Sequence, residues 1–282
     1  MPRVLKKMVR KGVRNLFGVD VVRATFDEGW AEERDYWLGV LRDFYRTTYD
    51  LDLHPSQTDS SLIPPLETIV KVQRANKAER DAFFASGYRG ALTYQTELLD
   101  YDLPVNRMRN ILEMGLGFGR LIIHYFPFEA NLYGCDVTPE AVAWTRSKLA
   151  DRVQIELTAG EPPLPYADGM FDFVYANSVF THVPCALMDR WAAELRRIIR
   201  PGGVLICSVL DANHYLRNIP YRDFHRDYQT PGCRDWDQAR GVRMRNYLDR
   251  NFLFSTWGRY FRVHELRAHY RDQSHLICKR EV

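Results

Sequence analysis

The 282-residue sequence has no apolar run of the roughly 20 residues that a membrane-spanning helix requires. Its amino terminus lacks the unbroken apolar core of a secretion signal. The net charge is only +3, and neither an aromatic-basic platform nor a DNA-reading motif accompanies the cationic residues. These absences predict a globular protein of the cytoplasm that does not bind nucleic acid.

Cysteine is also scarce. The five cysteines are odd in number and far apart, and two of them fall on predicted core strands. We therefore expect reduced, buried thiols rather than a disulfide framework, which agrees with a cytoplasmic location. No metal site is predicted. The five are Cys135, Cys185, Cys207, Cys233 and Cys278.

An apolar strand followed by closely spaced glycines is the most informative feature that the sequence does have. Residues 110–114 lead into Gly115, Gly117 and Gly119, with Glu113 just ahead of them. Glycine has no Cβ, so backbone N–H groups in such a turn can close on a ligand. A dinucleotide fingerprint needs G-x-G-x-x-G, which this turn does not supply, so an NAD-dependent oxidoreductase is a disfavoured alternative.

An acidic residue stands about 20 residues after the glycines, the place of the ribose-binding carboxylate in nucleotide-binding α/β sheets. It is Asp136, at the end of the apolar run 131–136, and Thr138 and Pro139 then open a helix. Further along, residues 171–177 and 204–209 read as buried strands on either side of a helix at 187–199. Alternating strands and helices predict an α/β fold with a parallel sheet.

Five parts of the sequence, in this order, resemble the motifs of the class I S-adenosylmethionine-dependent methyltransferases: residues 113–119, Asp136, and residues 164–175, 179–182 and 195–203. Residues 83–92 are similar to the helical lead-in of bacterial members that act on small molecules and glycans, so the resemblance runs from about residue 87 to the end. It implies a Rossmann-like methyltransferase fold. We expect a seven-stranded, mostly parallel sheet with helices on both faces, and a final antiparallel hairpin formed by residues 260–270 and 273–279.

The predicted organisation has three parts. Residues 1–20 form a basic amphipathic helix, residues 21–103 a helical cap, and residues 104–282 the methyltransferase domain. A polar segment at 211–257 interrupts its strand pattern. An unstructured loop of that length would be improbable in a compact domain, so we expect a functional lid or a helical insertion there.

The resemblance implies S-adenosylmethionine as the cofactor. To bind it, the main chain must come close to the cofactor, which Gly115, Gly117 and Gly119 allow. A carboxylate must also accept hydrogen bonds from the ribose diol, and Asp136 supplies it. By the same resemblance the adenine is flanked by Val137, Gly160 and Glu161. Asn177 lies beside the sulfonium, and Glu113 orients the loop or the amino group.

His182 is the candidate catalytic residue. An imidazole can take a hydroxyl proton near neutral pH, although the resemblance carries this histidine as part of a structural motif. His214, His225, Asp211 and Tyr88 are weaker candidates. Methyl transfer to the hydroxyl of a small molecule, sugar or glycan precursor is favoured over transfer to an amine. A non-catalytic partner protein that kept the fold is the remaining alternative.

Two charged segments bear on partners. Residues 212–250 hold eight arginines against five aspartates, which suits an anionic acceptor but equally a solvated lid with internal ion pairs. The basic helix at 1–20 could lie on an anionic membrane surface, or it could dock on the core or on a second subunit of an oligomer.

Overall fold

The computed structural model describes residues 29–65, 67–68, 80–212, 232–236, 245–269 and 273–282. The basic helix predicted at 1–20 lies outside these residues. By its contacts the chain divides into two units, one formed by Met1–Arg107 and Phe118–Glu129 and the other by Met108–Gly117 and Ala130–Val282. None of the described helices is long and apolar enough to cross a membrane.

The first unit is helical. Its helices are α1 (Trp30–Tyr49) and α3 (Arg80–Leu99), which pack against each other, with short 3-10 turns η1 (Pro55–Gln57), η2 (Ser60–Leu62), η3 (Val105–Arg107) and η4 (Ile122–Tyr125). Trp37, Leu41 and Phe44 are buried along one face of α1, at the spacing of an amphipathic helix. The buried face of α1 thus follows the apolar periodicity of its sequence.

A fully buried histidine lies inside this first unit. The Nδ1 atom of His124 is 3.1 Å from Nε2 of Gln57, and the Tyr88 hydroxyl donates to the Gln57 carbonyl at 2.8 Å. Burial, with a smaller contribution from the positive charge of Arg120, lowers the pKa of His124 to about 3. Tyr88 is therefore a core residue here.

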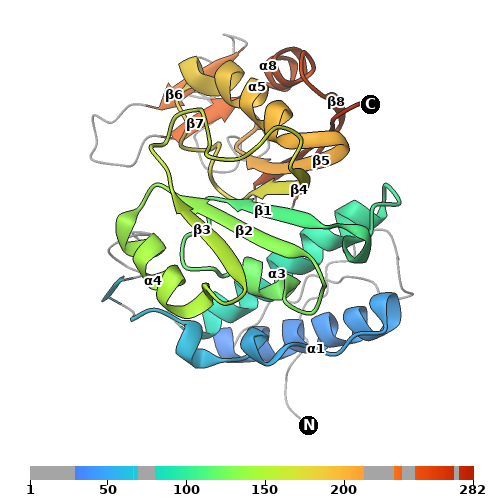
Figure 1. The fold of residues 1–282 in the computed structure, drawn as a ribbon, viewed down its shortest axis with the longest axis vertical. Helices are drawn as coiled ribbons and strands as arrows, with labels where there is room; N and C mark the ends of the chain where they lie inside the picture. The colour runs from blue at the N-terminus through green and yellow to red at the C-terminus, as the bar shows by residue number, and fades with distance from the viewer. Residues whose placement is uncertain (1–28, 66, 69–79, 213–231, 237–244, 270–272) are drawn as a thin grey trace. The chain divides into compact units, whose positions relative to one another are not determined.

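The second unit contains a seven-stranded sheet with the order β3-β2-β1-β4-β5-β9-β8 (Figure 1). Strands β1 to β5 are parallel, and β9 is antiparallel to both of its neighbours. This arrangement confirms the predicted sheet. The strands are β1 (Asn110–Met114), β2 (Asn131–Asp136), β3 (Val153–Leu157), β4 (Phe171–Ala176), β5 (Ile199–Val209), β8 (Arg262–Arg267) and β9 (Ser274–Lys279).

Helices cover both faces of this sheet. The connections β2 to β3 and β4 to β5 run in opposite directions along it, so right-handed crossovers place α4 (Pro139–Leu149) and α5 (Met188–Ile198) on opposite faces. On the α5 face a single apolar cluster joins Trp191 to Phe180 and to Trp257 of α8 (Arg250–Trp257). The predicted two-sided α/β architecture is confirmed.

The described part of the segment 211–257 is integrated into the fold. It contains a two-stranded antiparallel sheet, β6 (Cys233–Trp236) and β7 (Arg245–Leu248), followed by α8. Leu248 is fully buried in the apolar cluster, and its N–H donates to the Leu210 carbonyl at 2.8 Å. The ends of the segment therefore belong to the core of the second unit.

The cysteines correct one prediction. Cys135, Cys207 and Cys278 are free and buried, as expected for core strands. Cys185 is disulfide-bonded, so the expectation of reduced, buried thiols is wrong there. Its position explains the difference, because it is half-buried in the 3-10 turn η5 (Cys185–Leu187) rather than on a strand.

Candidate cofactor site

The carboxyl ends of the parallel strands meet at one edge of the sheet. Connections from β1 go to β2 on one side, while β4 on the other side leads on to β5, so the strand order reverses between β1 and β4. Ligands of open α/β sheets bind at such a switch point, outside the carboxyl ends of the strands. The turns after β1, β2 and β4 hold most of the predicted site residues.

The turn after β1 has a backbone that requires glycine. Gly115 and Gly117 have φ of 79° and 53°, and Gly119, which belongs to the other unit, has φ of 79°. A Cβ on Gly115 would overlap Cγ2 of Val179. The N–H groups of Gly115 and Leu116 are tied to the Cys135 carbonyl at 2.8 and 3.0 Å. The loop therefore packs tightly against Val179 and the end of β2, in a backbone conformation that favours glycine.

The Asp136 carboxylate holds the glycine loop. One carboxylate oxygen accepts the N–H of Gly117 at 2.7 Å, and the other accepts the N–H of Thr138 at 2.8 Å. A carboxylate has about four lone-pair positions, so acceptor capacity remains on this half-buried group. That capacity suits the two hydroxyls of a ribose. The sequence predicted the ribose role but not the bond to the loop.

An apolar surface lies beside Asp136. Val137 is 54% exposed, which is unusual for a valine next to a core strand. Gly160 has φ of 79°, and a Cβ there would lie 3.4 Å from Cγ1 of Val137, so the two residues are neighbours. Glu161 points to an exposed ion pair with Arg190 at 3.2 Å. A flat ring such as adenine would cover the exposed valine.

Glu113 is nearly fully buried and is bound within the sheet. The hydroxyl of Tyr175, directly opposite on β4, donates to its Oε2 at 3.0 Å. Sequence reasoning missed Tyr175, whose role depends on strand register. Asn177 is half-buried immediately after β4, at the same edge. The pair Glu113 and Tyr175 therefore fixes the strand ends from which the loop and Asn177 emerge.

The turn that carries His182 is anchored by a residue from the predicted insertion. The side-chain amide of Asn246 in β7 donates to the Phe180 carbonyl at 2.7 Å, and its N–H donates to the Thr181 carbonyl at 3.0 Å. Asn246 is fully buried. His182 is half-buried on this turn. No sequence motif signalled Asn246, because it lies more than 60 residues from its partners.

The sequence also predicted several weaker candidates. His214, His225 and seven of the eight insertion arginines fall outside the side chains that the structure describes. Arg250, the eighth, lies over the Phe254 ring at 4.7 Å from its centroid. Asp211 is buried after β5. The arginine hypothesis thus stays a prediction.

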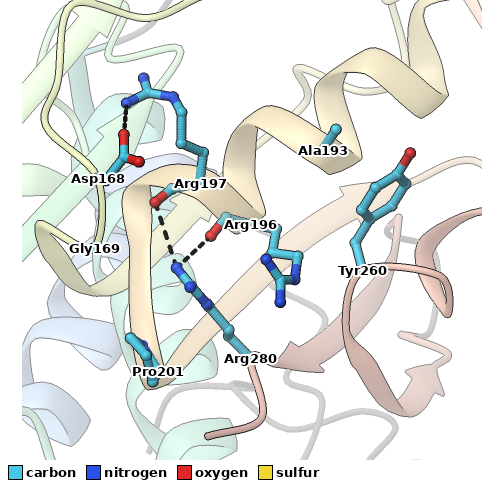
Figure 2. A pocket seen from close by; sticks show the side chains of 8 residues that line it. All are labelled: Asp168, Gly169, Ala193, Arg196, Arg197, Pro201, Tyr260 and Arg280. Atoms are coloured by element: carbon cyan, nitrogen blue, oxygen red, sulfur yellow. Dashed lines mark hydrogen bonds and ion pairs between the residues drawn. The ribbon is translucent and has the colours of Figure 1, made fainter.

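A hollow of about 420 Å³ occurs at the opposite, amino edge of β4 and β5 (Figure 2). Two of its three arginines, Arg197 and Arg280, bind groups of the fold. Arg197 pairs with Asp168 at 2.7 Å, and Arg280 donates to the carbonyls of Arg196 and Ile199 at the end of α5, at 2.7 and 2.6 Å. These contacts cap a helix and tie a loop. The hollow therefore does not compete with the carboxyl edge as a catalytic site.

Comparisons with known proteins cover the middle of the chain. The family model described as a methyltransferase domain matches residues 112–207, which run from β1 to β5 and include the glycine loop, Asp136 and the His182 turn. A malonyl-[acyl-carrier protein] O-methyltransferase of Hahella chejuensis is 33% identical over 107 residues, 36% of this chain and 37% of the relative. An uncharacterized methyltransferase of Mycobacterium tuberculosis is 32% identical over 117 residues, 42% of this chain and 46% of the relative.

Solved structures show the same fold. A protein from Pyrococcus horikoshii OT3 superposes with a TM-score of 0.53 at 16% identity, covering 85% of this chain and 99% of its own. A Burkholderia thailandensis 1,6-didemethyltoxoflavin-N1-methyltransferase with bound S-adenosylhomocysteine gives 0.51 at 14% identity, covering 78% and 92%.

The glycine loop, the acid after β2 and the His182 turn lie within the residues that match the methyltransferase domain, and the fold is that of class I S-adenosylmethionine-dependent methyltransferases. The matched domain and the shared fold indicate S-adenosylmethionine as the cofactor. The chain spans less than half the length of the curated relatives it matches.

Proposed function

We propose that this protein transfers a methyl group from S-adenosylmethionine to an oxygen, the hydroxyl of a small molecule or of a sugar or glycan precursor. The observation that carries the proposal is Asp136, whose carboxylate is hydrogen-bonded to the glycine loop and retains acceptor capacity at the switch point of the sheet.

The residues around Asp136 fit the cofactor. Asp136 accepts the ribose hydroxyls, Val137 and Gly160 contact the adenine with Glu161 at the rim, and Gly115, Gly117 and Gly119 let the backbone approach the amino-acid end. Glu113, held by Tyr175, keeps the loop in place. The exposed Val137 supports this assignment, since an adenine would remove its apolar surface from water.

The cofactor supplies a methyl group already activated on a sulfonium. The protein must then hold the acceptor oxygen in line with that carbon and exclude water. Asn177 and the turn that carries His182 lie at the end of β4, at the same edge of the sheet as the glycine loop. His182 is proposed to take the hydroxyl proton, because an imidazole can accept a proton near neutral pH.

Transfer to oxygen is supported by relatives named as O-methyltransferases. The proposal of an anionic acceptor rests on the arginines of residues 212–250, and that of a membrane contact on the basic residues of 1–20.

Calorimetric titration with S-adenosylhomocysteine and, separately, NAD tests the cofactor. We expect S-adenosylhomocysteine to bind and NAD not to bind, and the reverse would favour an oxidoreductase. Release of S-adenosylhomocysteine is then measured with sugars, nucleotide sugars, phenols and malonyl thioesters. His182→Ala should lower kcat and leave cofactor affinity unchanged. Cofactor binding without methylation of any acceptor would favour the non-catalytic alternative.

A further inference from the structure

A closed ring of three hydrogen bonds joins three strands beside the candidate site. The N–H of Ser178 donates to Oγ of Ser208 at 2.6 Å, the Ser208 hydroxyl donates to Oε1 of Gln273 at 2.6 Å, and Nε2 of Gln273 donates to Oγ of Ser178 at 2.7 Å. Ser178 follows β4, Ser208 lies in β5, and Gln273 immediately precedes β9. The ring therefore spans adjacent strands of the sheet.

The backbone sets the direction of the first bond. A main-chain N–H can only donate, so Oγ of Ser208 accepts from Ser178, and the Ser208 hydroxyl donates its own proton to Oε1 of Gln273. The amide of Gln273 then presents its nitrogen to Ser178. Ser208 is 1% exposed, so the loss of Gln273 leaves a buried hydroxyl without the acceptor of its proton.

The ring holds a residue in an uncommon conformation. Ser178 has φ of 58°, in the left-handed region that residues other than glycine rarely adopt. Such a conformation persists only where the surroundings enforce it, and it concentrates at functional sites. Two of the three ring bonds end on Ser178, one on its backbone and one on its side chain. These two hydrogen bonds hold Ser178 in the left-handed conformation.

The next residue transmits this geometry to the glycine loop. Val179 occupies the space that a Cβ on Gly115 would need. Strands β1 and β4 are paired in register up to Met114 and Ala176, so the two turns leave the sheet side by side. The position of Val179 therefore limits where Gly115 can lie.

We infer that Gln273 is a positioning residue of the cofactor site: through Ser178 it holds the turn after β4 against Gly115, and so sets the part of the glycine loop that receives the amino-acid end of the cofactor. This inference rests on the proposed function. Sequence motifs of the family did not include Gln273, which lies 95 residues from Ser178.

Two ligands that share the adenosine test the inference. S-adenosylhomocysteine has the amino-acid end, and 5′-methylthioadenosine lacks it. In Gln273→Met, which keeps side-chain length but cannot complete the ring, the Kd for S-adenosylhomocysteine should rise about tenfold, while that for methylthioadenosine changes less than about twofold. Ser208→Ala, a smaller change, should give the same pattern. The double variant should be no worse than either single variant, because all act on one ring.

Ser178→Gly provides a second arm. Glycine adopts a φ of 58° without strain, so Gln273→Met should have a much smaller effect in that background. Gln154→Met, on an exposed position of β3, is the matched control and should change neither Kd. Circular dichroism and melting temperature establish that each variant is folded.

Equal weakening of both ligands would show that the ring supports the fold alone, and unchanged affinities would show that the loop does not depend on it. Either result overturns the inference while leaving the proposed function intact. Failure of the wild-type protein to bind S-adenosylhomocysteine would instead overturn the proposed function, and the inference with it.

Discussion

The two edges of the parallel sheet use similar side chains differently. At the amino edge, Asp172 accepts the N–H groups of Arg109 and Asn110 at 2.9 and 2.8 Å on one oxygen and the Arg200 guanidinium at 2.6 Å on the other. At the carboxyl edge, each oxygen of Asp136 accepts a single backbone N–H. Asp172 therefore accepts three hydrogen bonds within the fold and Asp136 accepts two, so Asp136 keeps more acceptor capacity for a ligand.

The hydrogen bonds at the amino edge also lower the pKa values of its carboxylates. Burial alone would raise the pKa of Asp172, but its hydrogen bonds from Asn110, Arg200 and Arg109 bring the pKa below the usual value. Glu194 behaves alike: burial opposes the shift, and the Arg197 guanidinium and the Leu164 N–H lower its pKa. The paired carboxylates Asp172 and Glu194 stabilise the protein, whereas Asp136 accepts fewer hydrogen bonds beside the exposed Val137, which is the arrangement expected of a ligand-binding group.

The largest effect should come from Gly117→Val at the carboxyl edge. A β-branched residue cannot readily adopt φ of 53°, and its side chain would occupy ligand space. We expect no measurable binding of S-adenosylhomocysteine by calorimetry, with a native circular dichroism spectrum. Gly39→Ala in α1, where nothing lies within 4 Å of the added Cβ, is the control and should bind normally. Normal binding by Gly117→Val would refute the loop assignment.

Asn246→Ala should have the next largest effect. It leaves the buried carbonyl groups of the His182 turn without donors, and such losses cost about 1–3 kcal/mol for each buried group. We expect a lower melting temperature and reduced turnover with little change in cofactor affinity. Asn251→Ala, on the exposed surface of α8, should alter none of these. Full turnover by Asn246→Ala would show that methyl transfer does not depend on the position of the His182 turn.

A smaller effect concerns acid stability at the amino edge. The pKa of Asp172 is lower in the folded protein than in the unfolded chain, so its contribution is present above the unfolded value and is lost as pH falls through the folded value. The melting temperature of Asp172→Asn should therefore lie several degrees below wild type at pH 6 and approach it near pH 3. A constant difference across that range would contradict the pairing.

His124 adds a pH dependence of its own in the helical unit. Its folded pKa of about 3 is below the usual value of 6.5, so it stabilises the fold above pH 6.5 and progressively less as pH falls toward 3. Its contribution changes by up to about 1.4 kcal/mol per pH unit in that window. Urea unfolding of wild type and His124→Gln between pH 4.5 and 7 should converge at the acid end. Parallel curves would contradict a buried neutral imidazole.

The sequence predicted what is local and missed what is distant. The glycine loop and Asp136 could be recognised because each is a short motif that directly follows its strand. Tyr175 was missed because its bond to Glu113 depends on which strands pair. Asn246 and Gln273 were missed because their partners lie 60 or more residues away, and hydrogen bonds between distant residues leave no periodic pattern.

The disulfide at Cys185 illustrates the same limit. Cysteine number and spacing indicated free thiols, which is right for the three on core strands. Whether a half-buried cysteine in a short turn meets a second one depends on the folded chain, and the sequence could not show this.

The comparison of the two carboxylates is tested most directly by calorimetric titration of Asp136→Ala and Asp172→Ala with S-adenosylhomocysteine. Loss of hydrogen bonds to a charged acceptor, about 1.5–3 kcal/mol each, should raise the Kd of Asp136→Ala at least about tenfold. Asp172→Ala should keep a Kd within about twofold of wild type and show the larger fall in melting temperature. Unchanged binding by Asp136→Ala, or equal weakening by both variants, would contradict the assignment of the cofactor site to the carboxyl edge.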